Sequence, residues 1–360
     1  MLTLEACGPY GSPGNLILTW DSSIVNIYMA PSGGTALTQF VTPFHGFNGT
    51  NLYVEGISPG TTTLSWTYSA QTNCPDNIQV SIPSVDFEET APNNGFDDTV
   101  DPPWLVVPVN NPPNQNTVKV NIEPSAAAAQ VYFTIDDPAK ATVSPAQASS
   151  SPQTLTLTGV AKGHTALRAR VGSSSGPICK TLNVCVRDKK VVIVDFHFMQ
   201  DNASNQTSRS TSEADGFVST LNTIWTPQAN VVFQKGSVDS PTVPTNLGSV
   251  VEWYPTNPAN EWDDIVAFRN GSAPDVFFVW EYEQDGTPAT DNADAAQLGG
   301  DILFEDNAGS EVGETLAHEM GHFLAVSPAD YTDRQDQLMH AYTDVRGQKI
   351  THAQVDQANP

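Results

Sequence analysis

Three residues toward the C-terminal end of the chain have the types and the spacing of a metal-dependent hydrolytic site. They are His318, Glu319 and His322 in the run His-Glu-Met-Gly-His. Residues four apart share one face of a helix, so both imidazoles can bind one zinc ion while Glu319 lies beside it. Zinc lowers the pKa of its bound water to about 7, and a neighbouring carboxylate can accept the proton. The pattern predicts peptide-bond hydrolysis with Glu319 as general base; the alternative is a helix with two surface histidines.

The motif requires a helix, and the surrounding sequence predicts one from about residue 310 to 326. Ser310 is its expected N-cap, and Glu311 and Glu314 stand in the first turn, where the helix dipole favours anions. Upstream, the helical spacing of apolar residues predicts one helix at Ser212–Trp225. Apolar runs predict strands at Val191–Phe196, Val231–Phe233, Val276–Trp280 and Asp301–Phe304. This mixture favours an α+β domain over residues 188–360.

Together these features resemble the metzincin clan of zinc peptidases, whose pattern is HExxHxxGxxH or HExxHxxGxxD followed by a methionine turn. The resemblance covers His318, Glu319, His322 and a candidate Met-turn at Leu338–Tyr342, within an element order spanning about residues 190–359. It implies a zinc endopeptidase that acts on protein or peptide substrates. It also implies an edge strand that pairs with the substrate backbone, which we expect at Asp301–Phe304.

The third zinc ligand is where the sequence departs from that pattern. Ala325 stands at the position of the turn glycine and Pro328 at that of the third ligand, so we expect the helix to end differently, at Ser327-Pro328. No Glu follows Glu319, which excludes the zincins that use a downstream glutamate. We predict Asp330 as the third ligand, on a turn two residues longer. The alternatives are Asp333, Asp336 and His340.

Tyr342 lies three residues after Met339 and matches a tyrosine that in some metzincins binds the metal or steadies the tetrahedral intermediate. The alternative is a packed core tyrosine. The other histidines have no partner at ligand spacing, and we interpret them as structural or exposed: His45, His164, His197 and His352.

The chain has four cysteines and no CxxC pair, so a cysteine zinc site is not expected. Cys7 and Cys74 bracket one candidate domain and could form a bridge. Cys179 and Cys185 would lie about 20 Å apart on an extended strand, so they are joined only if the chain turns between them.

Two stretches of the N-terminal half are similar to each other. Gly56–Trp66 and Gly159–Ala169 both consist of a GxxxG turn and an alternating strand, 103 residues apart, which is the length of one Ig-like sandwich. They resemble the bacterial Ig-like modules attached to secreted or surface enzymes. We therefore expect Ig-like sandwiches at residues 1–84 and 114–187, joined by a linker and entry to the second repeat at residues 85–113. The predicted fold is multidomain: two all-β sandwiches, then an α+β metzincin-like zinc peptidase domain at 188–360.

Charge and composition restrict the partners. A formal charge of −25 disfavours nucleic acid, and no apolar run is long enough for membrane insertion. The first seven residues lack the features of a signal peptide, yet the Ig-like resemblance favours an extracellular or surface-associated protein whose repeats bind a surface or carrier particle.

Two other functions stay open: a surface or particle-decorating binding protein with a vestigial peptidase domain, and a metal-dependent hydrolase of something other than peptides. A fragment starting near Asp188 is expected to fold without the repeats.

Overall fold

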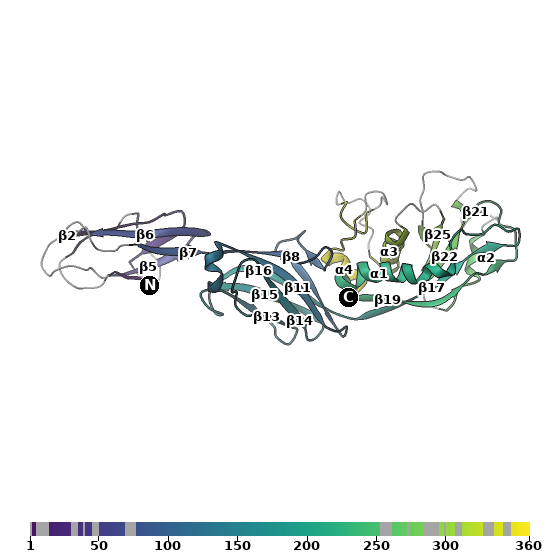
Figure 1. The fold of residues 1–360 in the computed structure, drawn as a ribbon, viewed down its shortest axis with the longest axis horizontal. Helices are drawn as coiled ribbons and strands as arrows, with labels where there is room; N and C mark the ends of the chain where they lie inside the picture. The colour runs from purple at the N-terminus through teal and green to yellow at the C-terminus, as the bar shows by residue number, and fades with distance from the viewer. Residues whose placement is uncertain are drawn as a thin grey trace.

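The computed structural model describes residues 2–4, 14–29, 35–38, 40–44, 50–68, 77–252, 261–271, 274–283, 295–298, 300–306, 312–326, 335–340 and 347–360. Three parts follow one another along the long axis of the molecule: a first sandwich, a second sandwich and a C-terminal unit (Figure 1). Among the described residues, no helix is both long and apolar enough to cross a membrane.

The first sandwich contains two sheets with the strand orders β1-β5-β3 and β4-β2-β6-β7. Its strands are β1 (Leu2–Leu4), β2 (Gly14–Thr19), β3 (Val25–Tyr28), β4 (Phe40–Phe44), β5 (Thr50–Gly56), β6 (Gly60–Tyr68) and β7 (Asn77–Ile82). Alternate residues of β3 are buried, as a half-buried strand requires. The small core of this sandwich consists of Leu18, Val25, Ile27, Leu52 and Leu64.

The second sandwich has the sheet orders β12-β15-β16-β10-β9 and β13-β14-β11-β8. Its elements are β8 (Ser84–Glu89), β9 (Phe96–Asp97), β10 (Trp104–Val109), β11 (Gln115–Glu123), η1 (Ser125–Gln130), β12 (Val131–Ile135), β13 (Ala141–Ser144), β14 (Gln153–Gly159), β15 (Gly163–Val171) and β16 (Ile178–Asp188). Our expectation of a linker at residues 85–113 is corrected here. β8 pairs with β11 and β10 pairs with β16, and their apolar residues complete the core of this sandwich.

The GxxxG turns have the same role in both sandwiches. In the first, the turn leads from β5 in one sheet to β6 in the other, and in the second it leads from β14 to β15. The second glycine of each turn, Gly60 or Gly163, has a φ of +146° or +141°. Residues with a Cβ rarely adopt this backbone region, which explains why glycine recurs at the position.

Cys179 and Cys185 both lie on β16 and are free thiols. They are not joined, because the chain does not turn between them. Cys7 and Cys74 lie outside the described residues.

The C-terminal unit is built on a five-stranded sheet with the order β19-β17-β22-β25-β24. Only β24 is antiparallel to its neighbour. The elements are β17 (Lys190–Phe198), β18 (Gln200–Asp201), η2 (Thr211–Glu213), α1 (Ala214–Ala229), β19 (Val231–Asp239), β20 (Thr242–Val243), β21 (Val251–Glu252), α2 (Trp262–Val266), β22 (Asp275–Val279), β23 (Tyr282–Glu283), β24 (Ala295–Leu298), β25 (Asp301–Glu305), α3 (Val312–Phe323) and α4 (His352–Ala358).

The sheet confirms the expected strands and corrects two details. β25, which we expected at the edge, lies between β22 and β24, and β24 is the edge strand. The sequence did not predict β24, because this strand is short, follows a run of polar residues and shows no periodic pattern. β17 is not buried throughout: Val191 and Ile193 are 46% and 51% exposed.

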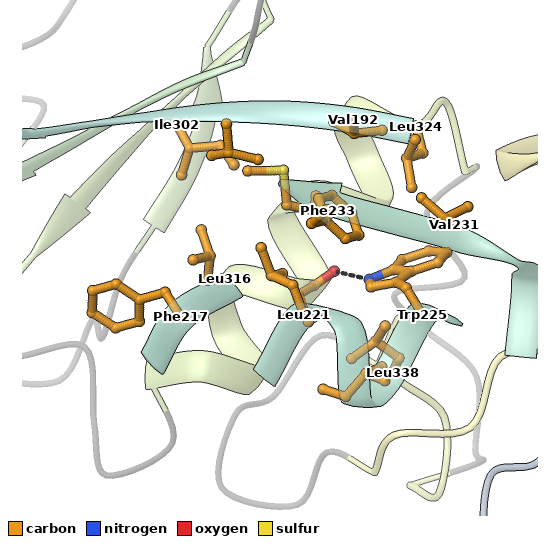
Figure 2. Packing of buried hydrophobic residues seen from close by; sticks show 14 of the residues in the cluster. Val192, Phe217, Leu221, Trp225, Val231, Phe233, Ile302, Leu316, Leu324 and Leu338 are labelled. Carbon is orange, nitrogen blue, oxygen red and sulfur yellow. Dashed lines mark hydrogen bonds between the residues drawn. The ribbon is translucent and has the colours of Figure 1, made fainter. Parts of the chain in front are cut away.

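Helices α1 and α3 cover one face of the sheet. Phe217, Leu221 and Trp225 of α1 and Leu316 of α3 pack with Phe233 of β19 in one buried cluster (Figure 2). The helical spacing of the apolar residues in the sequence predicted this face of α1. A smaller cluster on the opposite face includes Leu247, Ile265 and Phe277.

The second sandwich is joined closely to the C-terminal unit. Val106 of β10 belongs to the core cluster of that unit. Asn359 Nδ2 donates to the carbonyl oxygens of Asp188 and Ala229 at 2.9 and 2.8 Å, and Lys349 Nζ lies 2.6 Å from Asp98 Oδ1. In Figure 1, α4 lies beside the second sandwich although it is the last element of the chain. These shared contacts argue against the expectation that a fragment starting near Asp188 folds alone.

Candidate metal centre

Helix α3 carries the two histidines of the predicted site. His318 and His322 are four residues apart, and their Nε2 atoms lie 3.1 Å from each other. The ring planes cross at 84°, with the centroids 4.7 Å apart. Both imidazoles therefore direct the same nitrogen toward one point.

A contact with the segment after the helix determines the tautomer of His318. Its Nδ1 lies 2.9 Å from the carbonyl oxygen of Leu338, in a buried position. A carbonyl oxygen only accepts hydrogen bonds, so Nδ1 must carry a proton. In the neutral ring Nε2 is then the unprotonated nitrogen, which is the form that binds a metal.

The spacing of the two Nε2 atoms fits a zinc ion. Two Zn–N bonds of about 2.0–2.1 Å at a tetrahedral angle separate the nitrogens by about 3.4 Å. The observed 3.1 Å is close to that distance. Because one ring is also fixed in the metal-binding tautomer, the donor set suits zinc.

Met339 lies directly beneath the histidine helix. Its side chain is fully buried, and a Cβ added to Gly321 would lie 2.5 Å from Met339 Sδ and 3.3 Å from Trp225 Cζ2. The glycine between the two histidines therefore allows the thioether to approach the helix backbone. Met339 belongs to the Met-turn expected at Leu338–Tyr342, which stays a prediction because residues 341 and 342 lie outside the described part of the chain.

Backbone hydrogen bonds hold Leu338 in position. Leu338 N donates to Lys349 O at 2.8 Å, and Lys349 N donates to Asp336 O at 2.9 Å. Gln228 of α1 supports the segment around Lys349: its Nε2 donates to Gln348 O and its Oε1 accepts from Ile350 N, both at 2.8 Å. The carbonyl oxygen that orients His318 thus rests on α1 through a chain of hydrogen bonds.

Trp225 joins α1 to the start of the motif. Its Nε1 donates to Ala317 O at 3.1 Å inside the core, which Figure 2 shows as a dashed line. The donor is fully buried, so the hydrogen bond satisfies a group that would otherwise be costly to bury. The residue before His318 is therefore held both by packing and by a directed bond.

The C-terminal end of α3 corrects our expectation about Ala325. The helix ends at Phe323, and Ala325 adopts the left-handed conformation, with a φ of +63°. Val326 N donates to Gly321 O and Ala325 N donates to His322 O, which is the Schellman arrangement. Ala325 thus takes the backbone conformation that favours glycine, and the helix ends without Ser327-Pro328, which lies outside the described residues.

Glu319, the predicted general base, is 7% exposed on α3 between the two histidines in sequence. The predicted third ligand Asp330 and the tyrosine Tyr342 lie outside the described residues, as does Asp333. Among the alternatives to Asp330, the structure describes Asp336 and a buried His340. The ligand set beyond His318 and His322 stays a prediction.

Two of the remaining histidines meet in space although their sequence positions gave no sign of it. His164 of β15 and His352 of α4 lie with Cys185 and Asp356, and the ligand atoms of these four residues are all within 4.8 Å of one another. Burial is the main cause of two pKa shifts there: it lowers the pKa of His352 and raises that of the Cys185 thiol to about 12. Only the four-residue spacing of His352 and Asp356 was visible in the sequence.

His197 is fully buried and structural, as expected. Its Nδ1 lies 2.7 Å from Asp239 Oδ1 and its Nε2 lies 2.9 Å from Asp275 Oδ1. These contacts join β17, β19 and β22 away from the α3 histidines. His45 lies outside the described residues.

Three solved structures illustrate what the chain resembles. Domains 4 and 5 of the S-layer protein SbsC are 22% identical over 37% of this chain and 68% of that chain, with a TM-score of 0.20. A C-terminal fragment of intimin, in complex with the intimin-binding domain of the translocated intimin receptor, is 13% identical over 53% and 60%, with a TM-score of 0.25. Metalloproteinase-II from Bacteroides fragilis is 8% identical over 70% and 84%, with a TM-score of 0.32.

Likeness at these TM-scores does not determine an activity for this chain, and no curated protein matches it. A family model does match part of the sequence. Its residues lie in the second sandwich, between the loop before β10 and the start of β16. Residues 99–180 are a bacterial Ig-like domain (group 2).

Proposed function

We propose that the chain is a zinc-dependent endopeptidase that hydrolyses peptide bonds, with Glu319 as general base. The observation that supports this most directly is the hydrogen bond from His318 Nδ1 to Leu338 O, which leaves Nε2 beside Nε2 of His322. A helix with two surface histidines has no need for a buried carbonyl that selects one tautomer. The bond orients a ligand, which is the usual role of the second contact of a metal-binding histidine.

His318 and His322 would hold the zinc ion together with a third ligand, for which Asp330 is our candidate. Zinc supplies an acidified water and polarises the scissile carbonyl when it is bound. Glu319 would accept the proton of that water and return it to the leaving amine. Tyr342 is our candidate for a group that would donate a hydrogen bond to the oxygen of the tetrahedral intermediate.

The substrate backbone would pair with β24. Among the described strands, this one lies at the edge of the sheet, and α3 packs against it, so an extended peptide on this edge would run past the histidine helix. An unpaired strand edge offers main-chain donors and acceptors irrespective of side-chain sequence. Protein or peptide substrates therefore suit the site.

The sandwiches would carry this unit at a cell or particle surface. The bacterial Ig-like match at residues 99–180 also favours a second candidate, a surface or particle-decorating binding protein whose peptidase-like unit is vestigial. The two functions differ in one measurable property, which is cleavage of peptides by zinc-loaded protein.

The test compares zinc content and cleavage of a peptide library in wild type, Glu319→Ala and His318→Ala. Glu319→Ala should keep the zinc content of wild type and lose about 10²–10⁴-fold in activity, because it removes only the proton acceptor. His318→Ala should lose one zinc ion and all activity. Full zinc loading without cleavage in the wild type would favour the binding protein. Equal zinc loss in both variants would show that Glu319 is not a general base.

A further inference from the structure

The junction between the second sandwich and α4 brings together four side chains of metal-binding type. His164 on β15 is the cross-strand partner of Cys185 on β16, so their side chains share one face of the sheet. His352 and Asp356 are four residues apart on α4 and share one face of that helix. The sheet supplies one pair and the helix supplies the other, and all four ligand atoms lie within 4.8 Å of one another.

The donor set suits zinc. Thiolate, imidazole and carboxylate are its common ligands, whereas magnesium and calcium select oxygen alone. Tetrahedral zinc separates such donors by about 3.3–3.6 Å, so the atoms must approach by about 1 Å, which side-chain rotation can supply. Asp356 Oδ2 already lies 3.4 Å from His352 Nε2.

His352 Nε2 is shielded from solvent, and its contact with Asp356 Oδ2 at 3.4 Å does not have the geometry of a hydrogen bond. Trp104 stacks on the ring, with centroids 3.6 Å apart and an interplanar angle of 16°, and it meets His164 edge-on at 5.5 Å. The tryptophan covers the cluster and orients both imidazoles. A buried nitrogen whose polar contact is long and poorly aligned gains from a ligand that satisfies it.

Arg187 shows that the cluster accepts positive charge. Its guanidinium pairs with Asp356 Oδ1 and lies 3.3 Å from His164 Nε2. A guanidinium only donates, so His164 Nε2 carries a lone pair that accepts from Arg187. A metal ion would take over this lone pair and Asp356 Oδ2, while Arg187 keeps Oδ1 and supports the carboxylate from outside.

We propose that His164, Cys185, His352 and Asp356 form a zinc site that joins the second sandwich to the C-terminal unit. Binding releases the thiol proton of Cys185 and gives a thiolate, which with the Asp356 carboxylate balances the charge of the ion. α4 directly follows the segment whose Lys349 backbone holds Leu338, so the site anchors the support of His318. The proposal does not depend on peptidase activity.

Cobalt distinguishes this site from the one on α3, because only the junction contains a thiol. The full chain is stripped of metal and titrated with Co²⁺, and the thiolate-to-cobalt charge-transfer band in the near ultraviolet is recorded. Wild type and a His318→Ala/His322→Ala variant should both show the band, and Cys185→Ser should not. Cys179→Ser is the matched control on the same strand and should keep it.

Zinc content gives a second measurement. About two zinc ions per chain are expected in wild type, and about one in either Cys185→Ser or the double histidine variant. His164→Gln, at a half-exposed position that tolerates substitution, should keep the band and bind zinc at least about tenfold more weakly. A band that survives Cys185→Ser, or a double histidine variant without metal, would show that the junction is held by the Arg187–Asp356 ion pair and packing alone.

Discussion

The side-chain amide of Asn230 donates to Val109 O and Arg187 O, at 3.0 and 2.7 Å. Its own oxygen accepts from Asn111 Nδ2 at 2.8 Å. Asn230 is fully buried and ends α1 in the left-handed conformation, with a φ of 53°. The residue that caps the C-terminal end of α1 thus joins the sandwich to the unit that carries the histidine pair.

Replacing Asn230 by glycine should lower the free energy of unfolding by about 3 kcal/mol. Glycine keeps the left-handed backbone, so the loss of stability comes from the missing side-chain amide. Its absence leaves buried carbonyl oxygens without a donor, and each of these costs about 1–3 kcal/mol. Denaturant unfolding of full-length protein provides the value. Asn230→Asp is the control: it keeps the shape and removes the donors, and it should be at least as unstable. A loss below about 1 kcal/mol in Asn230→Gly would show that the junction contributes little to stability.

A fragment of residues 188–360 should be unstable, whereas a fragment of residues 84–360 should be as stable as the whole chain. The shorter fragment exposes the cluster that Val106 completes and removes Asp98, the partner of Lys349. It also removes the carbonyl oxygens of Val109 and Arg187, to which Asn230 donates. Thermal unfolding and solubility of the two fragments provide the comparison. Equal melting temperatures would support the expectation from the sequence that residues 188–360 fold independently.

Ala325→Gly should raise the free energy of unfolding by about 1 kcal/mol, because Ala325 occupies a left-handed position at the end of α3. The same substitution at Ala353, exposed in α4, is the control and should destabilise by up to about 1 kcal/mol. Chemical denaturation should therefore give shifts of opposite sign. Destabilisation by both substitutions would mean that α3 does not end in this motif.

Asp330→Ala should remove one zinc ion and abolish cleavage, because hydrolytic zinc sites use three protein ligands and leave the fourth position to water. Asp333→Ala and His340→Gln should keep both zinc ions. Zinc content and peptide cleavage are measured on the same preparations. If His340→Gln loses the metal and Asp330→Ala does not, the third ligand comes from the segment next to Met339 and the longer turn is wrong.

Local patterns in the sequence determined a large part of this structure. The spacing of Phe217, Leu221 and Trp225 predicted the buried face of α1, and apolar runs located β17, β19 and β22. The spacing of His318 and His322 implied two nitrogens directed to one point, because the rise and turn of a helix depend only on neighbouring residues. The repeated GxxxG turns predicted the same backbone conformation in both sandwiches for the same local reason.

Contacts between distant residues were decided only by the tertiary structure. The tautomer of His318 depends on Leu338, which hydrogen bonds from Lys349 hold in place. Strand order placed β24 rather than β25 at the edge, since pairing depends on the whole sheet. Cys185 had no metal-binding partner in the sequence, yet packing of α4 on the second sandwich brings His352 and Asp356 to it. Ligand spacing along a chain reveals pairs on one helix or one turn, whereas a site assembled across a domain junction has no local pattern.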